Sequence, residues 1–318
     1  KIQDYLDEDQ TYKKSLGSLE DLLLPWGRVQ FLDRVYLPNF VFGPEDVVVA
    51  IGQDGLVANT LKYLTGGQPL IGVNPDPARW DGALLPFHLH QITGVVPEVL
   101  SGNYRSRAVT MAQARLNDGQ EILAVNDFFI GQRTHTSARY FIESGGVTEQ
   151  HSSSGVIVST GLGSTGWLKS LIHGAAAIAA ATGNEGEVNS QPVYLPWDAE
   201  SLYFTVREPF PSRQTQCDLV FGSVTREQPL RIRSLMPESG VLFSDGIEGC
   251  GFKDKLDTFK GQHLFVLGDE AVFGFRQDPH QRRMIERIER CADRQPPNQL
   301  GQHPVANEVF GQDLFEQI

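Results

Sequence analysis

The residues best placed to do chemistry are an aspartate and two glycines that follow a short apolar run. The run, Val47–Ile51, is rich in β-branched side chains, which is typical of a strand buried on both faces. The turn 52–55, with the sequence Gly-Gln-Asp-Gly, comes directly after it, and residues 56–64 place apolar side chains at helical spacing. The pattern predicts a strand, a turn and a helix, with Asp54 at the carboxyl end of a parallel strand, where open α/β sheets bind ligands.

The charge of this turn limits the chemistry that it can perform. Gly52 and Gly55 allow the backbone to approach a phosphate, and the helix amino terminus supplies N–H donors and a positive dipole end. Asp54 is a poor phosphate ligand because like charges repel, but it is a good base for a hydroxyl that attacks phosphorus. The alternative is that Asp54 only caps the helix, as aspartate often does. This segment alone leaves both interpretations open.

A second glycine-rich loop spans residues 155–166. Its Gly161, Gly163 and Gly166 fit the G-x-G-x-x-G fingerprint of dinucleotide-binding folds, with Glu185 near the distance of a ribose acid. The short strands predicted on both sides argue against a classical Rossmann domain at this place.

The same loop carries hydroxyl groups that suit the sugar, the base edges and the phosphates of a nucleotide. The hydroxyls belong to Ser159, Thr160, Ser164 and Thr165. The alternative is a tight strand-to-helix connection in which Ser164 or Thr165 caps the helix.

The overall composition is that of a globular protein. The 318 residues are 40% hydrophobic and 21% charged, enough for two domains or one large one. The formal net charge of −12 disfavours general binding to nucleic acid or an anionic membrane, so neither is expected as a partner. The three cysteines have no short spacing, no stretch approaches the ~20 apolar residues of a membrane span, and the first residues lack a signal-peptide core. We therefore expect a cytoplasmic protein.

The pattern of predicted elements changes along the chain, which indicates two domains. Residues 1–100 are predicted to form an α/β domain with a parallel, Rossmann-like sheet, because a second buried strand, 69–74, follows the first strand and helix. Residues 101–270 contain closely spaced short runs separated by turn residues, which predicts a β-rich, β-sandwich-like domain. The alanine-rich stretch 167–181 is expected to be a closely packed helix within it.

The tail, residues 271–318, differs from both domains. Opposite charges at three- and four-residue spacing between positions 282 and 290 predict an exposed helix. After Pro296-Pro297 the chain is expected to be loosely held. The tail is thus predicted to be helical or loose, and it could return to the first domain.

Taken in order, these segments resemble the motifs of the NAD kinase family. That family has a Gly-Gly-Asp-Gly turn, an Asn-Glu pair, a Thr-Pro-(Thr/Ser)-Gly-Ser/Thr-Thr-Ala-Tyr loop and a Phe-Asp-Gly near the end of a β-rich domain. The turn 52–55 looks like the first motif, and Asn126-Asp127 looks like the second. Ser159–Trp167 is similar to the third, and Phe243–Gly246 to the last. The resemblance covers roughly residues 46–270.

The resemblance implies phosphorylation of the adenosine-ribose 2′-hydroxyl of NAD by ATP or polyphosphate, which gives NADP. Mg²⁺ would come with the ATP, mainly on its phosphates, and no metal site made of protein side chains is predicted. Asp54 would be the general base. Phosphate or nucleotide contacts are implied for Gly52, Gln53, Gly55, Asn126, Asp127, Ser164, Thr165, Gly166, Ser170 and Asp245, the last as a substrate or subunit contact. Family members commonly form dimers or tetramers, so a homo-oligomer is expected.

Five departures from the family pattern leave the acceptor open, and one of them is the connection 76–81, which is unlike the family's usual glycine-leucine-glycine connection. Gln53 replaces the second glycine, Asp127 a glutamate, Ser154 an acid, and Trp167 a tyrosine. Because these changes cluster on the acceptor side, phosphoryl transfer is better supported than the assignment of NAD as the acceptor. Two alternatives follow: a nucleotide-binding sensor without turnover, motivated by Gln53 and Ser154, and a kinase for another hydroxyl, such as that of a lipid or a sugar.

Overall fold

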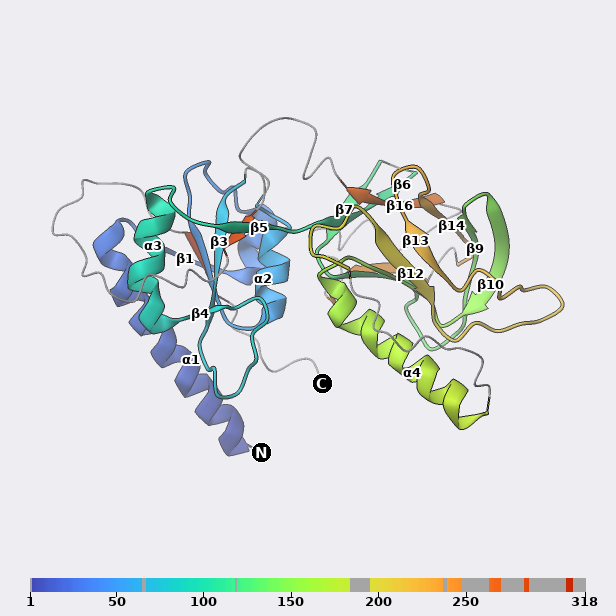
Figure 1. Cartoon of the computed structure of the whole chain (residues 1–318), viewed down its shortest axis with the longest axis horizontal. Coiled ribbons are helices and arrows are strands. Elements are labelled where there is room, and N and C mark those ends of the chain that lie inside the picture. Colours follow the sequence, from blue (N-terminus) through green and yellow to red (C-terminus); the bar gives the residue numbers. More distant parts are fainter. Residues whose placement is uncertain are drawn as a thin grey trace. The chain divides into compact units, whose positions relative to one another are not determined.

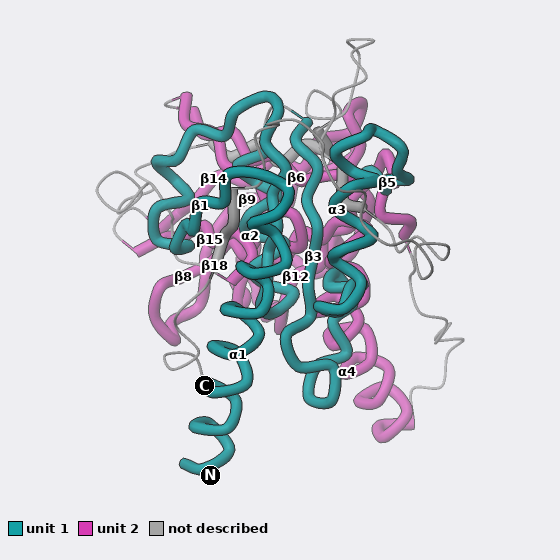
Figure 2. Tube along the Cα trace, turned by 90° about the vertical axis from the view of Figure 1, so that its left-hand side faces the viewer, with its two compact units in different colours: residues 1–108, 276–318 teal, residues 109–275 magenta. Residues whose placement is uncertain are grey.

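The chain divides into two compact units, coloured separately in Figure 2. Residues 1–108 and 276–318 form the first unit, and residues 109–275 form the second. The carboxyl-terminal residues therefore belong to the same unit as the amino-terminal ones. The computed structural model describes residues 2–64, 67–117, 119–183, 195–236, 239–246, 263–269, 283–285 and 307–310.

The first unit contains a mostly parallel sheet. Its strands are β1 (Gln30–Asp33), β2 (Val48–Ile51), β3 (Pro69–Asn74), β4 (Phe87–His88), β5 (Ser106–Ala108), β17 (Arg283–Ile285) and β18 (Asn307–Phe310). Among the described residues, the strand order is β1-β18-β2-β3-β17-β5, and β4 pairs with β3. The pairing of β17 with β5 is antiparallel and the other pairings are parallel.

Helices cover both faces of this sheet. Figure 1 shows α1 (Ile2–Leu23) and α3 (Ile92–Leu100) on one face and α2 (Asp54–Leu61) on the other. All four residues of β2 are buried, and Val49 and Ile51 join one apolar cluster with residues of α1 and α3. Successive side chains of a strand point to opposite faces, so the alternate residues of β2 are left for the face of α2. The predicted parallel α/β architecture is confirmed.

The helix predicted from the charges between positions 282 and 290 is wrong at its start. Residues 283–285 form β17, which pairs with β3 and β5. Charge pairs on a helix contribute only about 0.2–0.5 kcal/mol each, whereas an extended segment between two strands satisfies its backbone groups in the sheet. Residues 286–306 lie outside the described part of the chain.

The second unit consists of two antiparallel sheets. Among the described residues, one sheet has the order β10-β9-β14-β16-β6-β7 and the other β13-β12-β11-β8-β15. The first sheet comprises β6 (Met111–Leu116), β7 (Glu121–Ala124), β9 (Ala138–Ser144), β10 (Val147–Ser153), β14 (Leu230–Ser234) and β16 (His263–Asp269). The second comprises β8 (Asp127–Gln132), β11 (Val156–Ser159), β12 (Leu202–Val206), β13 (Phe221–Val224) and β15 (Gly240–Ser244).

One apolar core joins the two sheets. It contains Tyr140 and Ile142 of the first sheet together with Phe128, Val158 and Phe204 of the second. Two antiparallel sheets that share a core form a β-sandwich. The predicted β-rich, sandwich-like fold is therefore confirmed.

The alanine-rich helix α4 (Trp167–Ala181) is present, but the close packing expected for it is wrong. Leu168 is its one buried residue. Alanine has the highest intrinsic helix propensity, so such a sequence forms a helix with little help from packing. No helix in the described part of the chain is both long and apolar enough to cross a membrane.

Candidate functional site

Asp54 is the first residue of α2 and lies just beyond β2, as predicted. Gln53 is the residue in the N-cap position, and its side chain makes no capping bond. The Asp54 carboxylate instead accepts hydrogen bonds from the backbone N–H groups of Leu84 (2.8 Å) and Ala83 (3.2 Å). Asp54 therefore ties the connection after β3 to the turn, which differs from the helix-cap alternative.

The turn leaves room for a further role of the half-buried Asp54. A carboxylate has about four lone-pair sites, and the bonds from Ala83 and Leu84 use one on each oxygen. Gly52 has a φ of +156°, and a Cβ atom there would lie 3.2 Å from Cδ2 of Leu56, so a larger residue would be strained. Gln53 and Gly55 are exposed. The turn is open to solvent beside a carboxylate with spare accepting capacity.

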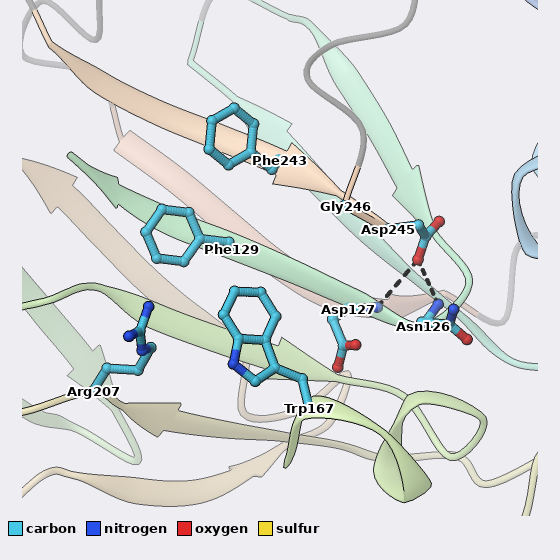
Figure 3. A pocket seen from close by; sticks show the side chains of 8 residues that line it. All are labelled: Asn126, Asp127, Phe129, Trp167, Arg207, Phe243, Asp245 and Gly246. Atoms are coloured by element: carbon cyan, nitrogen blue, oxygen red, sulfur yellow. Dashed lines mark hydrogen bonds between the residues drawn. The ribbon is translucent and has the colours of Figure 1, made fainter. Parts of the chain in front are cut away.

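A pocket of about 260 Å³ lies in the second unit. Figure 3 shows polar residues on one side of it and aromatic rings with an arginine on the other. The lining combines apolar surface with a few converging polar groups, as ligand sites commonly do. The lining residues are Asn126, Asp127, Phe129, Trp167, Arg207, Phe243, Asp245 and Gly246.

Asp245 organises the polar side of this pocket. Its carboxylate accepts backbone hydrogen bonds from Asn126 (2.6 Å), Val125 (3.0 Å) and Asp127 (3.2 Å). Asp245 itself has a φ of +55°, a region that aspartate tolerates better than most residues. These bonds give Asp245 a positioning role, because its charge is directed at the segment that carries the Asn-Asp pair. The substrate or subunit contact predicted for it stays a prediction.

Replacing Asp245 by asparagine tests this role. Asparagine keeps the shape and tolerates the positive φ, but it removes the charge. Its side-chain NH₂ group would also face backbone N–H groups that now donate to the carboxylate. A hydrogen bond to a charged group contributes about 1.5–3 kcal/mol, so we expect Asp245→Asn to lower the free energy of unfolding by about 2 kcal/mol. Urea unfolding measures it, with the exposed Asp198→Asn as the matched control. Equal losses in the two variants would contradict the positioning role.

The carboxyl group of Asp127 is the most perturbed group in the pocket. Its pKa is raised to about 7, mainly by burial and also by the charge of Asp245, while a hydrogen bond with Ser159 acts in the opposite direction. Its Oδ1 atom is buried without a hydrogen-bond partner in the described part of the chain. An orphaned buried oxygen beside a cavity is what a ligand hydroxyl or N–H would satisfy.

The raised pKa of Asp127 predicts a pH dependence of stability. An unfolded aspartate titrates near 4, so the extra proton affinity of the folded chain stabilises it fully below about pH 4, and this contribution is lost as the pH rises to about 7. Asp127→Asn cannot titrate. Between pH 5 and pH 8 we expect wild type to lose stability relative to this variant, on the order of 2 kcal/mol at about 1.4 kcal/mol per pKa unit, discounted for partial exposure. Urea unfolding at both pH values measures this, and parallel curves would exclude the shift.

The hydroxyl-rich loop serves its own structure more than a ligand. The Oγ1 atom of Thr160 donates to the carbonyl of Val125 (2.6 Å), and Oγ of Ser164 donates to the carbonyl of Gly161 (2.7 Å). Ser164 is only 3% exposed, so the nucleotide contact predicted for its side chain has no open face. The other predicted contacts of this loop are exposed at the start of α4; they are Thr165, Gly166 and Ser170.

The glycines of this loop permit close backbone packing. A Cβ atom at Gly161 would lie 1.8 Å from the carbonyl oxygen of Pro196, and one at Gly163 would lie 2.2 Å from that of Asn126. The strand before the loop, β11, pairs antiparallel with β8 and β12, so the loop is not a Rossmann fingerprint. Glu185 lies outside the described residues.

Comparison with known proteins shows which proteins the chain resembles. No protein-family model matches it. It is 28% identical to the NAD kinase of Acidithiobacillus ferrooxidans over 183 residues, which cover 51% of this chain and 61% of that protein. It is 24% identical to a probable NADH kinase of Oryza sativa subsp. japonica, covering 77% of each. The structure of yeast NADH kinase complexed with NADH matches with a TM-score of 0.50 and 19% identity, covering 79% of this chain and 67% of that one.

The chain is thus similar in sequence to NAD and NADH kinases and similar in fold to yeast NADH kinase. The resemblance found in the sequence is thereby confirmed, and the yeast structure supports the same two-part fold. A match to NAD kinase 2, mitochondrial, of Homo sapiens has 27% identity and covers 53% of this chain and 52% of that protein. The chain thus spans about three fifths of the Acidithiobacillus protein and half of the human one.

Five pocket residues were not predicted as site residues from the sequence; they are Phe129, Trp167, Arg207, Phe243 and Gly246. Phe129 of β8 and Phe243 of β15 are direct cross-strand neighbours. Phe243 and Gly246 lie in the motif Phe243–Gly246, and Phe129 lies just after the Asn126-Asp127 pair. Trp167 was noted as a departure from a tyrosine. Arg207 had no sequence signal, because it reaches the pocket only through the pairing of β12 with β11.

Proposed function

We propose that the chain is a phosphotransferase that phosphorylates the adenosine-ribose 2′-hydroxyl of NAD or NADH with ATP or a similar donor. The kinship with the NAD and NADH kinases carries this proposal. Asp54 supports it, because its carboxylate lies at the carboxyl end of a parallel strand with spare accepting capacity. Asp54 would take the hydroxyl proton as the oxygen attacks the terminal phosphorus.

The pocket of the second unit would bind the dinucleotide. The side chain of Asn126 and the orphaned Oδ1 of Asp127 are the groups available to ribose hydroxyls and amides. Asp245 holds the backbone of both residues, so the pair is oriented before ligand binds. Preorganisation of this kind lowers the entropic cost of binding.

Mg²⁺ fits this site as an ion carried by the donor. Among the described residues, no group of three or more His, Cys, Asp or Glu side chains lies together as a metal cage. Mg²⁺ is commonly bound by substrate phosphates with only one or two protein carboxylates, so such a cage is not required. When bound, the ion would neutralise charge on the transferred phosphoryl group.

Binding and turnover distinguish this proposal from its alternatives. Calorimetry of the full chain with NAD and NADH, followed by an assay for NADP or NADPH with ATP and Mg²⁺, is the test. Product formation supports the kinase, whereas tight binding without product supports the nucleotide sensor. Phosphorylation of a lipid or sugar hydroxyl from a substrate panel, without NADP or NADPH, supports the third hypothesis. Light scattering on the same sample tests the expected homo-oligomer.

A further inference from the structure

Three aromatic rings form a row along one side of the pocket. The ring centroids of Phe129 and Trp167 lie 6.0 Å apart, those of Phe129 and Phe243 lie 5.7 Å apart, and both pairs are within 15° of parallel. Figure 3 shows the rings side by side, brought together from β8, β15 and the start of α4. Trp167 is 39% exposed, a large value for an indole inside a cavity wall. Such a surface is suited to stacking against a flat ring of a ligand.

Arg207 places a positive charge at the end of this row. Its guanidinium carbon lies 5.6 Å from the ring centroid of Trp167. Its Nε atom is buried without a hydrogen-bond partner among the residues that the structure describes. Its ion pair with the exposed Glu208 is long at 3.5 Å, and exposed pairs of that kind contribute little. Most of the charge of Arg207 is therefore available to a ligand.

The negative groups on the opposite side offset this charge only in part. The carboxylate of Asp245 is engaged by three backbone N–H groups. The Asp127 carboxyl group, whose pKa burial raises to about 7, is partly protonated near neutral pH. Among the lining residues that the structure describes, Arg207 is the one cation, and its guanidinium lies against Trp167 at the aromatic end.

We propose that this aromatic end binds an uncharged flat ring, and that Arg207 makes it prefer the neutral dihydronicotinamide ring of NADH over the cationic nicotinamide ring of NAD. This inference rests on the proposed function, because it assigns the redox state of that substrate. A cationic ring stacked on Trp167 would meet the like charge of Arg207. A neutral ring meets no such repulsion, and the phosphate next to it can pair with the guanidinium.

Removing the arginine is expected to abolish or reverse the preference for the reduced ligand. Without Arg207 the faces of the rings attract a cation, since aromatic faces carry negative potential. Two unit charges at about 6 Å interact strongly enough at the edge of a protein to change an affinity ratio by about tenfold after screening. We therefore expect wild type to bind the reduced ligand about tenfold more tightly than the oxidised one, and Arg207→Gln to bind both about equally or to favour the oxidised one.

The test uses oxidised and reduced nicotinamide mononucleotide, which differ in the ring and share the phosphate. Their dissociation constants are measured by calorimetry on the full chain for wild type, Arg207→Gln, Arg207→Lys and the exposed control Arg213→Gln. We expect Arg207→Lys and the control to keep the preference for the reduced form. An unchanged ratio in Arg207→Gln, or no binding of either form, would overturn the inference.

Turnover gives a second, independent readout. If neither NAD nor NADH is phosphorylated but Arg207→Gln still shifts the binding ratio, the inference holds and the kinase proposal fails. If both are phosphorylated and kcat/KM for NADH relative to NAD does not depend on Arg207, the kinase proposal holds and the inference is overturned.

Discussion

Asp54→Asn is expected to lower kcat for phosphorylation by roughly 10²–10⁴-fold, the usual contribution of a positioned general base. In free energy this is about 3–5 kcal/mol of activation barrier. The amide keeps the size of the side chain but cannot accept the hydroxyl proton. Because the proposal assigns proton transfer to Asp54 and dinucleotide binding to the pocket of the second unit, we expect the affinity for dinucleotide to change much less than kcat. Steady-state kinetics with ATP as the fixed donor measures both.

The structural role of Asp54 requires its own control. Its carboxylate holds the N–H groups of Ala83 and Leu84, so the asparagine variant also loosens that connection. Gly82→Ala disturbs the same connection and leaves the carboxylate in place, because Gly82 has a φ of +61° and a Cβ there would lie 2.6 Å from Nδ2 of Asn74. We expect Gly82→Ala to retain most of the activity. A loss as large as that of Asp54→Asn would show that anchoring, and not proton transfer, explains the effect.

Gly163→Ala is expected to produce a large loss of stability. Its Cβ would lie 2.2 Å from the carbonyl oxygen of Asn126, a backbone atom that cannot rotate away. Overpacking usually costs about 1–3 kcal/mol, and we expect a loss of about 3 kcal/mol because the main chain itself must move. The displacement reaches the Asn-Asp segment, so dinucleotide binding should weaken as well. Thermal or urea unfolding and calorimetry measure the two effects.

Gly174→Ala is the matched control for this prediction. Gly174 lies inside α4, and no atom is within 4 Å of the position of its Cβ. Alanine is favoured over glycine in a helix by about 0.8–1.0 kcal/mol, so this variant should be slightly more stable than wild type. If Gly163→Ala is tolerated as well as Gly174→Ala, the close approach of the loop to Asn126 does not constrain the site.

The parts of the fold that could be predicted from sequence are those fixed by local patterns. The strand, turn and helix around Asp54 were predicted because a buried strand and an amphipathic helix each leave a periodicity in one short segment. β17 and β18 could not be predicted in this way, since their partners lie more than 170 residues away in the chain. Short-range charge spacing therefore gave a helix where a long-range pairing makes a strand.

In the pocket, too, residues in local motifs were predictable and contacts between distant segments were not. Asn126, Asp127 and Asp245 were identified from motifs, and all three line the pocket. The role of Asp245 was not predictable, because its three hydrogen bonds join segments about 120 residues apart. Arg207 was missed for the same reason, and the burial of Ser164 depends on packing that no local pattern records.

The position of the transferred phosphate tests the central proposal most directly. The full chain is incubated with ATP, Mg²⁺ and NADH or NAD, and the product is examined by phosphorus–proton correlation NMR. A parallel sample contains the dinucleotide that lacks the adenosine-ribose 2′-hydroxyl. The account predicts a phosphate coupled to the 2′ proton of that ribose, little product with Asp54→Asn, and none with the 2′-deoxy dinucleotide. A phosphate at another position, or equal product from the 2′-deoxy compound, would contradict it.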